Sequence, residues 1–146
     1  MAELIYSVKS VFQDYLYNGQ LYNIPEYQRG YKWTEQQVEQ LLKDTHEFET
    51  GGDNDLFYCL QNITLVEKDG NFNVVDGQQR LTTLTIFIAA LTSLLSGSDR
   101  DECLTYVMEP GKRLQGIEAK PRLKLRPRDK DFFTETVQSL NFDALA

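Results

Sequence analysis

Residues 72–95 have the sequence FNVVDGQQRLTTLTIFIAALTSLL, and this stretch decides the fold. Phe72–Val75 follows the hairpin signal Asp69-Gly70, so it predicts the returning strand of a β-hairpin. Beyond Gly77, apolar residues recur at spacings of three and four, which is typical of an amphipathic helix. These residues are Leu81, Leu84, Ile88, Leu91 and Leu95. The stretch therefore predicts a buried strand, a tight turn at Gly77 and a long helix.

The junction between this strand and this helix is a candidate phosphate site. The first backbone N–H groups of a helix have no partner within the helix, and the helix dipole places partial positive charge there. A glycine at position 77 leaves room for a ligand. Arg80 falls in the first turn, where its guanidinium can pair with a phosphate, and Gln78 and Gln79 add neutral donors and acceptors. Gly77, Gln78, Gln79 and Arg80 are therefore the predicted anion cradle.

Asp76 does not fit simple phosphate binding, because a carboxylate repels a phosphate. It fits the site if it binds Mg²⁺, contacts a ribose hydroxyl or positions a water molecule. In the alternative interpretation Asp76 is only the N-cap of the helix and Arg80 is exposed. The residues alone leave both interpretations open.

A second candidate cluster is residues 24–33, IPEYQRGYKW. Aromatic side chains interleaved with cations can stack on bases and pair with phosphates. Alternatively, the aromatic side chains pack on the core while the cations face water. Thr34 and Gln37 have the capping-box spacing and predict that a helix begins directly after this cluster. The two clusters form one site if Arg29 and Arg80 point into the same pocket.

The bulk properties indicate an ordinary globular chain. It has 146 residues, which favours one domain, with 41% hydrophobic and 25% charged residues. Cys59 and Cys103 lack metal-ligand spacing and are interpreted as reduced thiols. We expect no leader sequence, and no apolar run in the sequence is long enough for a membrane span. We therefore expect a cytoplasmic location and no membrane partner.

The charge is unevenly distributed along the chain. A net charge of −7 and a pI of about 4.7 argue against nucleic-acid binding over the whole surface. The segment Lys112–Lys130 nevertheless contains eight of the fifteen basic residues and only two acidic ones. Its candidate DNA contacts are Arg122, Lys124, Arg126 and Arg128. The alternative is a solvated segment whose charges balance the acidic remainder.

Further elements are predicted from periodicity and turn signals. In chain order they are a helix over 7–18, strands over 21–24 and within 58–67, a helix over 99–108, a half-exposed strand over 123–126 and a helix over 129–140.

The two clusters together resemble a known family. IPEYQRGYKW resembles the signature IPxYQRxYxW of that family, and DGQQRLTTL resembles its second motif, in the same order along the chain. The chain is thus similar to the domain-of-unknown-function family 262, typified by the GmrS half of the GmrSD type IV restriction enzymes. The resemblance is clear over residues 7–95 and weak over 123–133. It implies an α+β fold of the ParB/sulfiredoxin-like kind, with a small mixed sheet packed against helices. We expect residues 1–146 to be one such domain, an N-terminal fragment of a longer protein.

The resemblance also implies a function. Relatives bind and hydrolyse a nucleoside triphosphate, GTP or ATP, and this activity regulates or drives cleavage of modified DNA by a C-terminal HNH-type nuclease domain or partner subunit. Mg²⁺ is the expected metal cofactor. The residues carried over are Gln28, Arg29, Gly77, Gln78 and Arg80 for nucleotide binding, Asp76, Gln79 and Arg80 for catalysis, and Asp76 for the metal. Only one histidine is present, so we expect no nuclease site in this chain.

Two other functions remain open on the sequence. The chain could be a non-catalytic module that binds DNA or senses its modification, through the Lys112–Lys130 segment and the aromatic loop. It could also be a structural or oligomerising fragment without a ligand.

Overall fold

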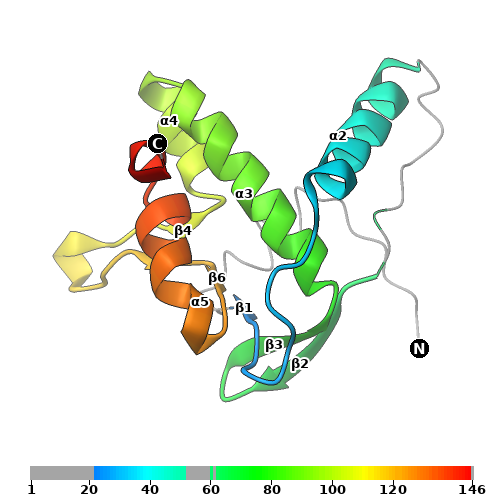
Figure 1. The fold of residues 1–146 in the computed structure, drawn as a ribbon. Coiled ribbons are helices and arrows are strands. Elements are labelled where there is room, and N and C mark those ends of the chain that lie inside the picture. Colours follow the sequence, from blue (N-terminus) through cyan, green and yellow to red (C-terminus); the bar gives the residue numbers. More distant parts are fainter. Residues whose placement is uncertain (1–21, 52–59, 61, 146) are drawn as a thin grey trace.

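A four-stranded mixed sheet forms the centre of the fold in the computed structural model, which describes residues 22–51, 60 and 62–145 (Figure 1). Its strand order is β2-β3-β1-β6. The strands are β1 (Tyr22–Asn23), β2 (Thr64–Lys68), β3 (Asn71–Asp76) and β6 (Leu123–Lys124). β2 and β3 are antiparallel, whereas β1 runs parallel to both β3 and β6. The mixed sheet and its helices confirm the predicted α+β class.

The β2–β3 hairpin turns where the sequence predicts. Asp69 and Gly70 both have positive φ angles, 52° and 76°, as a tight two-residue turn requires. Val74 in β3 is fully buried, and the strand then leads directly into the long helix α3 (Gln78–Leu94). The predicted strand, turn and helix over residues 72–95 are thus confirmed. The predicted apolar face is buried only in part, because Leu81 is buried whereas Leu91 and Leu95 are exposed.

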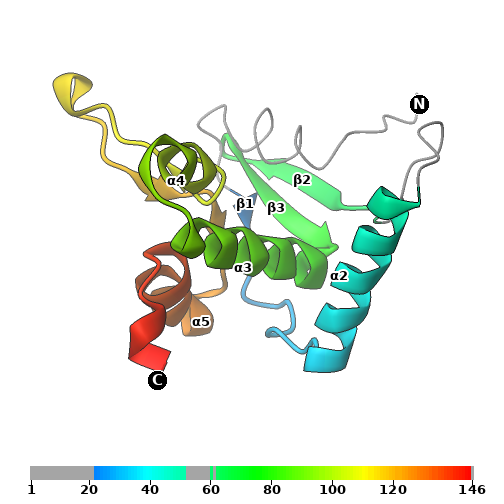
Figure 2. The same cartoon turned by 90° about the horizontal axis from the view of Figure 1, so that it is seen from above.

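Several helices surround α3, the long central helix of Figures 1 and 2. They are α2 (Glu35–Thr50), α4 (Gly97–Leu104) and α5 (Pro127–Phe132), the 3₁₀ turns η2 (Arg113–Gln115) and η4 (Phe142–Leu145), and the π-helical segment η3 (Phe133–Gln138). α2 lies near the start of α3, whereas α4 lies nearer its other end. α2 begins with the predicted capping box, in which the Thr34 N–H donates to Gln37 Oε1 at 2.9 Å.

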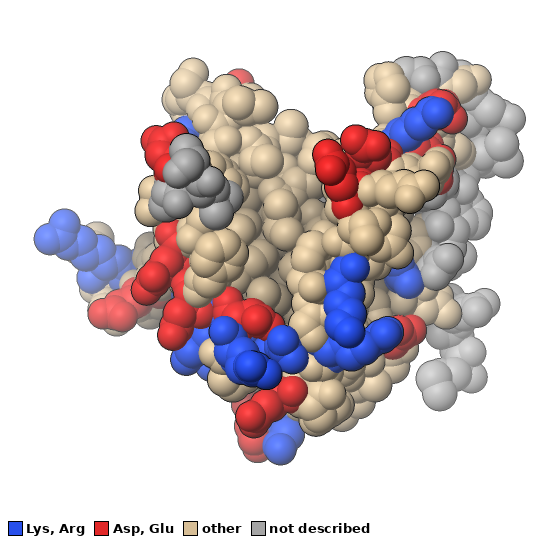
Figure 3. All heavy atoms as spheres, viewed as in Figure 1, with Lys and Arg blue, Asp and Glu red and all other residues tan. Residues whose placement is uncertain are grey.

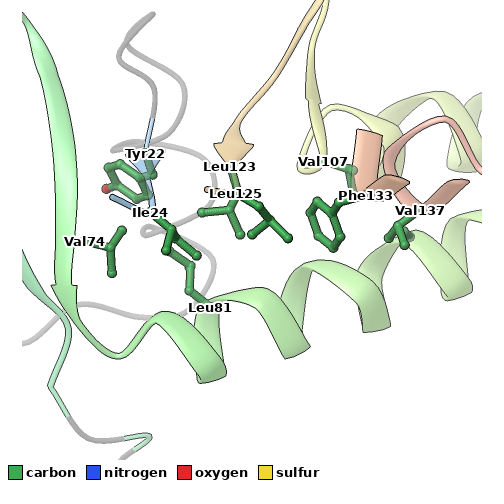
Figure 4. Packing of buried hydrophobic residues seen from close by; sticks show 10 residues of the cluster. Tyr22, Ile24, Val74, Leu81, Val107, Leu123, Leu125, Phe133 and Val137 are labelled. Atoms are coloured by element: carbon green, nitrogen blue, oxygen red, sulfur yellow. The ribbon is translucent and has the colours of Figure 1, made fainter. Parts of the chain in front are cut away.

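The core lies between the sheet and α3 and continues to η3 (Figure 4). Tyr22, Val74 and Leu123 come from three adjacent strands, and each is at most 1% exposed. Leu81 on α3 packs against this group, and Phe133 extends the core towards the C-terminal helices. The start of α3 is therefore anchored directly on the sheet.

The second half of the chain differs from the predicted elements. The helix expected over 99–108 ends at Leu104, and Met108–Glu109 instead form strand β4, which pairs with β5 (Lys120–Pro121). The last helix begins at Pro127, since proline suits the first helical position, and it widens into the π-helical η3 from Phe133.

The helix predicted over 7–18 and the thiol of Cys59 lie outside the described residues. No helix in the described ranges is long and apolar enough to cross a membrane.

Candidate functional site

Gly77 is the N-cap of α3 and has a left-handed conformation, with φ of 86°. A Cβ at this position would lie 3.1 Å from Ile63 Cγ1 and 3.2 Å from the carbonyl oxygen of Asn62. The chain itself therefore requires glycine here, both for the φ angle and for the close approach of the segment before β2. The prediction that this glycine leaves room for a ligand was wrong on this side of the turn, because Ile63 fills the space.

Asp76 is the last residue of β3, where it pairs with Thr64, and it is exposed. It is not the N-cap, so the interpretation of Asp76 as a capping residue was wrong. Within the described ranges, no group of three or more His, Cys, Asp or Glu residues is arranged to hold a metal ion. Asp76 is thus not part of such a group among the described residues.

The start of α3 is hydrogen-bonded to the loop that precedes α2, and we call this contact the motif junction (residues 28–32 with Gln78–Thr83). Gln79 binds the loop backbone twice. Its Nε2 donates to the carbonyl of Gly30 at 3.0 Å, and its Oε1 accepts from the N–H of Lys32 at 2.7 Å. One turn later, the hydroxyls of Tyr31 and Thr83 lie 2.8 Å apart. These bonds join the two sequence motifs into one structural unit.

Gln28 and Gln78 extend the motif junction towards the sheet. Gln78 Nε2 donates to Gln28 Oε1 at 3.2 Å, and Gln28 Nε2 donates to the carbonyl of Val75 at 3.1 Å. Gln78 is only 9% exposed. The amides predicted to bind the nucleotide or to take part in catalysis are therefore bound to the protein itself in this structure.

Arg80 and Arg29 do not converge. Arg80 Nη1 donates to the carbonyl of Asn62 at 3.1 Å, on the side of α3 where the chain enters β2. This bond holds the Arg80 guanidinium at Asn62 rather than at the loop before α2. Arg29 is exposed and lies at the motif junction. The arrangement in which Arg29 and Arg80 share a pocket was therefore not found.

Arg126 takes the place expected for Arg80. It lines a small pocket together with Arg29, Gln78, Gln79 and other residues of the junction. Its Nη1 donates to the carbonyl of Gln28 at 3.4 Å, and its Nε is bound to the carboxylate of Asp129. A Cβ on Gly30 would collide with the Arg126 guanidinium, so that glycine permits the close approach. The pocket volume is about 10 Å³, enough for about one water molecule.

Arg126 was predicted to contact DNA, and its place in this pocket was not predicted. Leu125, on one side of Arg126, is buried, and Pro127, on the other side, starts α5. These two neighbours place Arg126 beside the loop before α2. Only the pairing of β6 with β1, between residues far apart in the sequence, brings Arg126 to the first motif. No local pattern contains that information.

The other cations of the basic segment do not form one surface. Arg122 is 1% exposed, and its Nε donates to the carbonyl of Thr105, so the prediction that Arg122 contacts DNA was wrong. It sits between β5 and β6, where its side chain is drawn into the core. Lys120 pairs with Glu109 at 3.6 Å. Lys124 and Arg128 are exposed, as a role in DNA binding would require.

Figure 3 shows where positive charge gathers on one face of the molecule. Lys and Arg atoms lie on the loop before α2 and around α5, and Asp and Glu atoms lie among them. This is the region of Arg29, Arg126 and Asp129, which line the same pocket. The candidate site is therefore a mixed-charge surface with two arginines beside the start of α3.

The comparison with protein families agrees with the two motifs. The family model of the GmrSD restriction endonuclease, N-terminal domain, matches residues 8–146, and so covers both motifs and the segment that carries Arg126. No curated protein sequence matches the chain significantly. The match confirms the resemblance seen in the sequence, and the chain belongs to the family of GmrSD restriction endonuclease N-terminal domains.

Proposed function

We propose that this domain binds the polyphosphate of a nucleoside triphosphate where Arg29 and Arg126 flank the start of α3. Membership of a restriction endonuclease family assigns the chain to restriction and phage defence. In our proposal the bound nucleotide regulates the restriction enzyme. The observation that carries the proposal is that two arginines from distant segments line one pocket at the first turn of α3.

Electrostatics supports an anion at this place. The guanidinium groups of Arg29 and Arg126 are permanently charged, and each can donate two parallel hydrogen bonds to a phosphate. The N-terminus of α3 adds partial positive charge from a helix of 17 residues. No side-chain cap within the described residues satisfies its first N–H groups. This end of the helix therefore favours an anion.

The pocket must open before a triphosphate can bind. Its volume of about 10 Å³ is far below the several hundred Å³ of usual ligand sites. In the structure, the Arg126 Nε donates a hydrogen bond to the Asp129 carboxylate. A phosphate could replace this carboxylate, since the planar guanidinium of arginine can bind two oxygens of either group. We propose that the ligand exchanges with Asp129 and that the loop around Gly30 moves outward.

Hydrolysis is the second, separable part of the proposal. Asp76 is a single exposed carboxylate, and Mg²⁺ can be held by one carboxylate when nucleotide phosphates supply further ligands. The Mg²⁺ would neutralise charge on the phosphates. Gln79 could orient a water molecule only after releasing Gly30 and Lys32. Arg80, bound to Asn62, would support the turn rather than the phosphate unless it moves.

The test uses the protein with ATP and GTP, each with and without Mg²⁺. We expect at least one nucleotide to raise the melting temperature, because a ligand that binds only the folded state stabilises it. Phosphate release should fall in Asp76→Ala, whereas Glu39→Ala on α2 should match the wild type. Failure of every nucleotide at millimolar concentration to shift the melting temperature contradicts the binding proposal. Equal phosphate release by Asp76→Ala and the wild type contradicts only the hydrolytic part.

DNA is the expected partner of the whole restriction enzyme, and we propose that a C-terminal nuclease domain or a partner subunit cuts it. The mixture of charges in Figure 3 does not favour DNA binding at the nucleotide site itself. Lys124 and Arg128 remain candidate DNA contacts because they are exposed.

A further inference from the structure

A narrow β-arm projects from the body of the domain between β4 and β5 (Figures 1 and 2). We define the arm as residues 110–119. Its two sides are joined by reciprocal backbone hydrogen bonds between Lys112 and Ile117, at 2.8 and 3.1 Å. The turn η2 closes the tip, with the N–H of Gln115 donating to the carbonyl of Lys112 at 2.8 Å. Near its base, a Cβ on Gly111 would lie 2.7 Å from the backbone nitrogen of Ala119. The arm therefore has a defined shape that its own backbone maintains.

An apolar side chain stands at the tip of this arm. Leu114 is 104% exposed, the largest value among the exposed large hydrophobic residues. Ile117, on the other side of the turn, is 45% exposed. Leu114 contributes nothing to the core, so its apolar side chain is available to a partner.

Two cations accompany Leu114 at the tip. Lys112 and Arg113 are exposed, and neither forms an ion pair with a described residue. The acidic residue of the arm, Glu118, lies on the returning side, and Glu109 at the base is paired with Lys120. The turn itself is thus positively charged on a chain whose net charge is −7.

We propose that the arm binds duplex DNA in the minor groove, with Leu114 wedged between base pairs and Lys112 and Arg113 on the adjacent phosphates. Proteins that bend DNA insert apolar side chains, leucine among them, between base steps and hold the flanking backbone with cations. This contact is separate from the nucleotide site, and it does not depend on the proposed function.

Charge complementarity favours DNA over a protein surface as the partner. An acidic domain repels DNA over most of its surface, so a basic projection is needed to reach the duplex. A protein pocket would accept the leucine, but such a pocket does not by itself require the two cations at the tip. The phosphates on both sides of a minor groove would engage them.

The experiment measures binding of the protein to a short, unmodified duplex of mixed sequence over a series of salt concentrations, without nucleotide. One base of the duplex is 2-aminopurine, whose fluorescence rises when it is unstacked. The variants are Lys112→Ala/Arg113→Ala, Leu114→Ser and the control Lys43→Ala, an exposed cation on α2. All the substituted side chains are exposed, so the melting temperatures should equal that of the wild type.

Each variant has its own expected signature. The double variant should bind more weakly, and its plot of log affinity against log salt should become shallower by about 0.9 for each cation removed. Leu114→Ser should keep the salt dependence but lose the 2-aminopurine signal. Lys43→Ala should behave as the wild type. The proposal is overturned if the wild type does not bind the duplex, if the double variant keeps full affinity, or if Leu114→Ser leaves the unstacking signal unchanged.

Discussion

The motif junction and the arm are built in opposite ways. At the junction, side chains from three segments far apart in the sequence hold one another, through Gln79, Gln28 and Arg126. In the arm, backbone hydrogen bonds within one short segment maintain the shape, and the side chain of Leu114 is fully exposed. Polar residues at the junction are thus used mainly for structure, whereas side chains of the arm remain available to a partner.

This difference changes how the two sequence motifs should be interpreted. Glutamines beside the start of a helix suggest ligand contacts, yet here Gln78 and Gln79 attach the helix to the preceding loop. The positive charge available to a ligand comes from residues at the margin of the junction, Arg29 and Arg126.

The largest expected effect comes from the core under the motif junction. Leu81 is fully buried, so Leu81→Ala should lower the free energy of unfolding by about 2–5 kcal/mol. Leu114→Ala should change it by less than about 0.5 kcal/mol, because the side chain is already exposed. Urea denaturation of both variants measures the difference. Similar losses of stability would mean that the arm is packed against the body of the protein.

A smaller effect is expected at the turn into α3. Gly77→Ala places a β-carbon both at a φ angle of 86° and against Ile63. Gly70→Ala has a similar φ angle of 76° but meets no atom within 4 Å, so it isolates the cost of the backbone conformation. That cost is about 1–2 kcal/mol. The contact with Ile63 should make Gly77→Ala more destabilising than Gly70→Ala by about 1 kcal/mol or more. Equal unfolding free energies for the two variants would show that the segment before β2 gives way easily.

The smallest effect is expected when the junction loses one amide. Gln79→Ala removes the bonds to Gly30 and Lys32 and should lower the free energy of unfolding by about 1–2 kcal/mol. Trp33 is the only tryptophan and follows Lys32 directly, so its fluorescence should shift to longer wavelength as the loop is released. Gln36→Ala, an exposed glutamine on α2, is the control and should change neither quantity. An unchanged Trp33 spectrum in Gln79→Ala would show that the loop is held by other contacts.

Local sequence patterns predict the local part of this fold well. The helix α3, the Asp69-Gly70 turn and the Thr34–Gln37 capping box each depend on residues close together in the chain, and all three are present in the structure. The buried face of α3 was predicted less well, because Leu91 and Leu95 are exposed while Thr85 and Ala89 are buried. The pairing of β4 with β5 was missed because two-residue strands have no detectable alternation.

The arrangement of the site could be predicted only in part. The two motifs do meet, but which arginine joins Arg29 depends on strand pairing across nearly the whole chain. The half-exposed strand predicted over residues 123–126 is present as β6, Leu123–Lys124. The burial of the preceding Arg122 depends on the carbonyl of Thr105, which no spacing rule identifies. The count of basic residues over Lys112–Lys130 therefore overestimated the exposed positive surface of that segment.

Nucleotide affinity of Arg126→Ala compared with Arg80→Ala tests the central claim most directly. The nucleotide that stabilises the wild type is titrated into each variant by calorimetry, with Arg126→Lys as the conservative control. Loss of a charged hydrogen-bonding pair is worth about 1.5–3 kcal/mol, so Arg126→Ala should bind about ten- to a hundredfold more weakly. Arg126→Lys should recover part of the nucleotide affinity. Arg80→Ala should lower the stability of the domain but keep most of the nucleotide affinity. Wild-type affinity in Arg126→Ala, with binding lost in Arg80→Ala, would contradict the account.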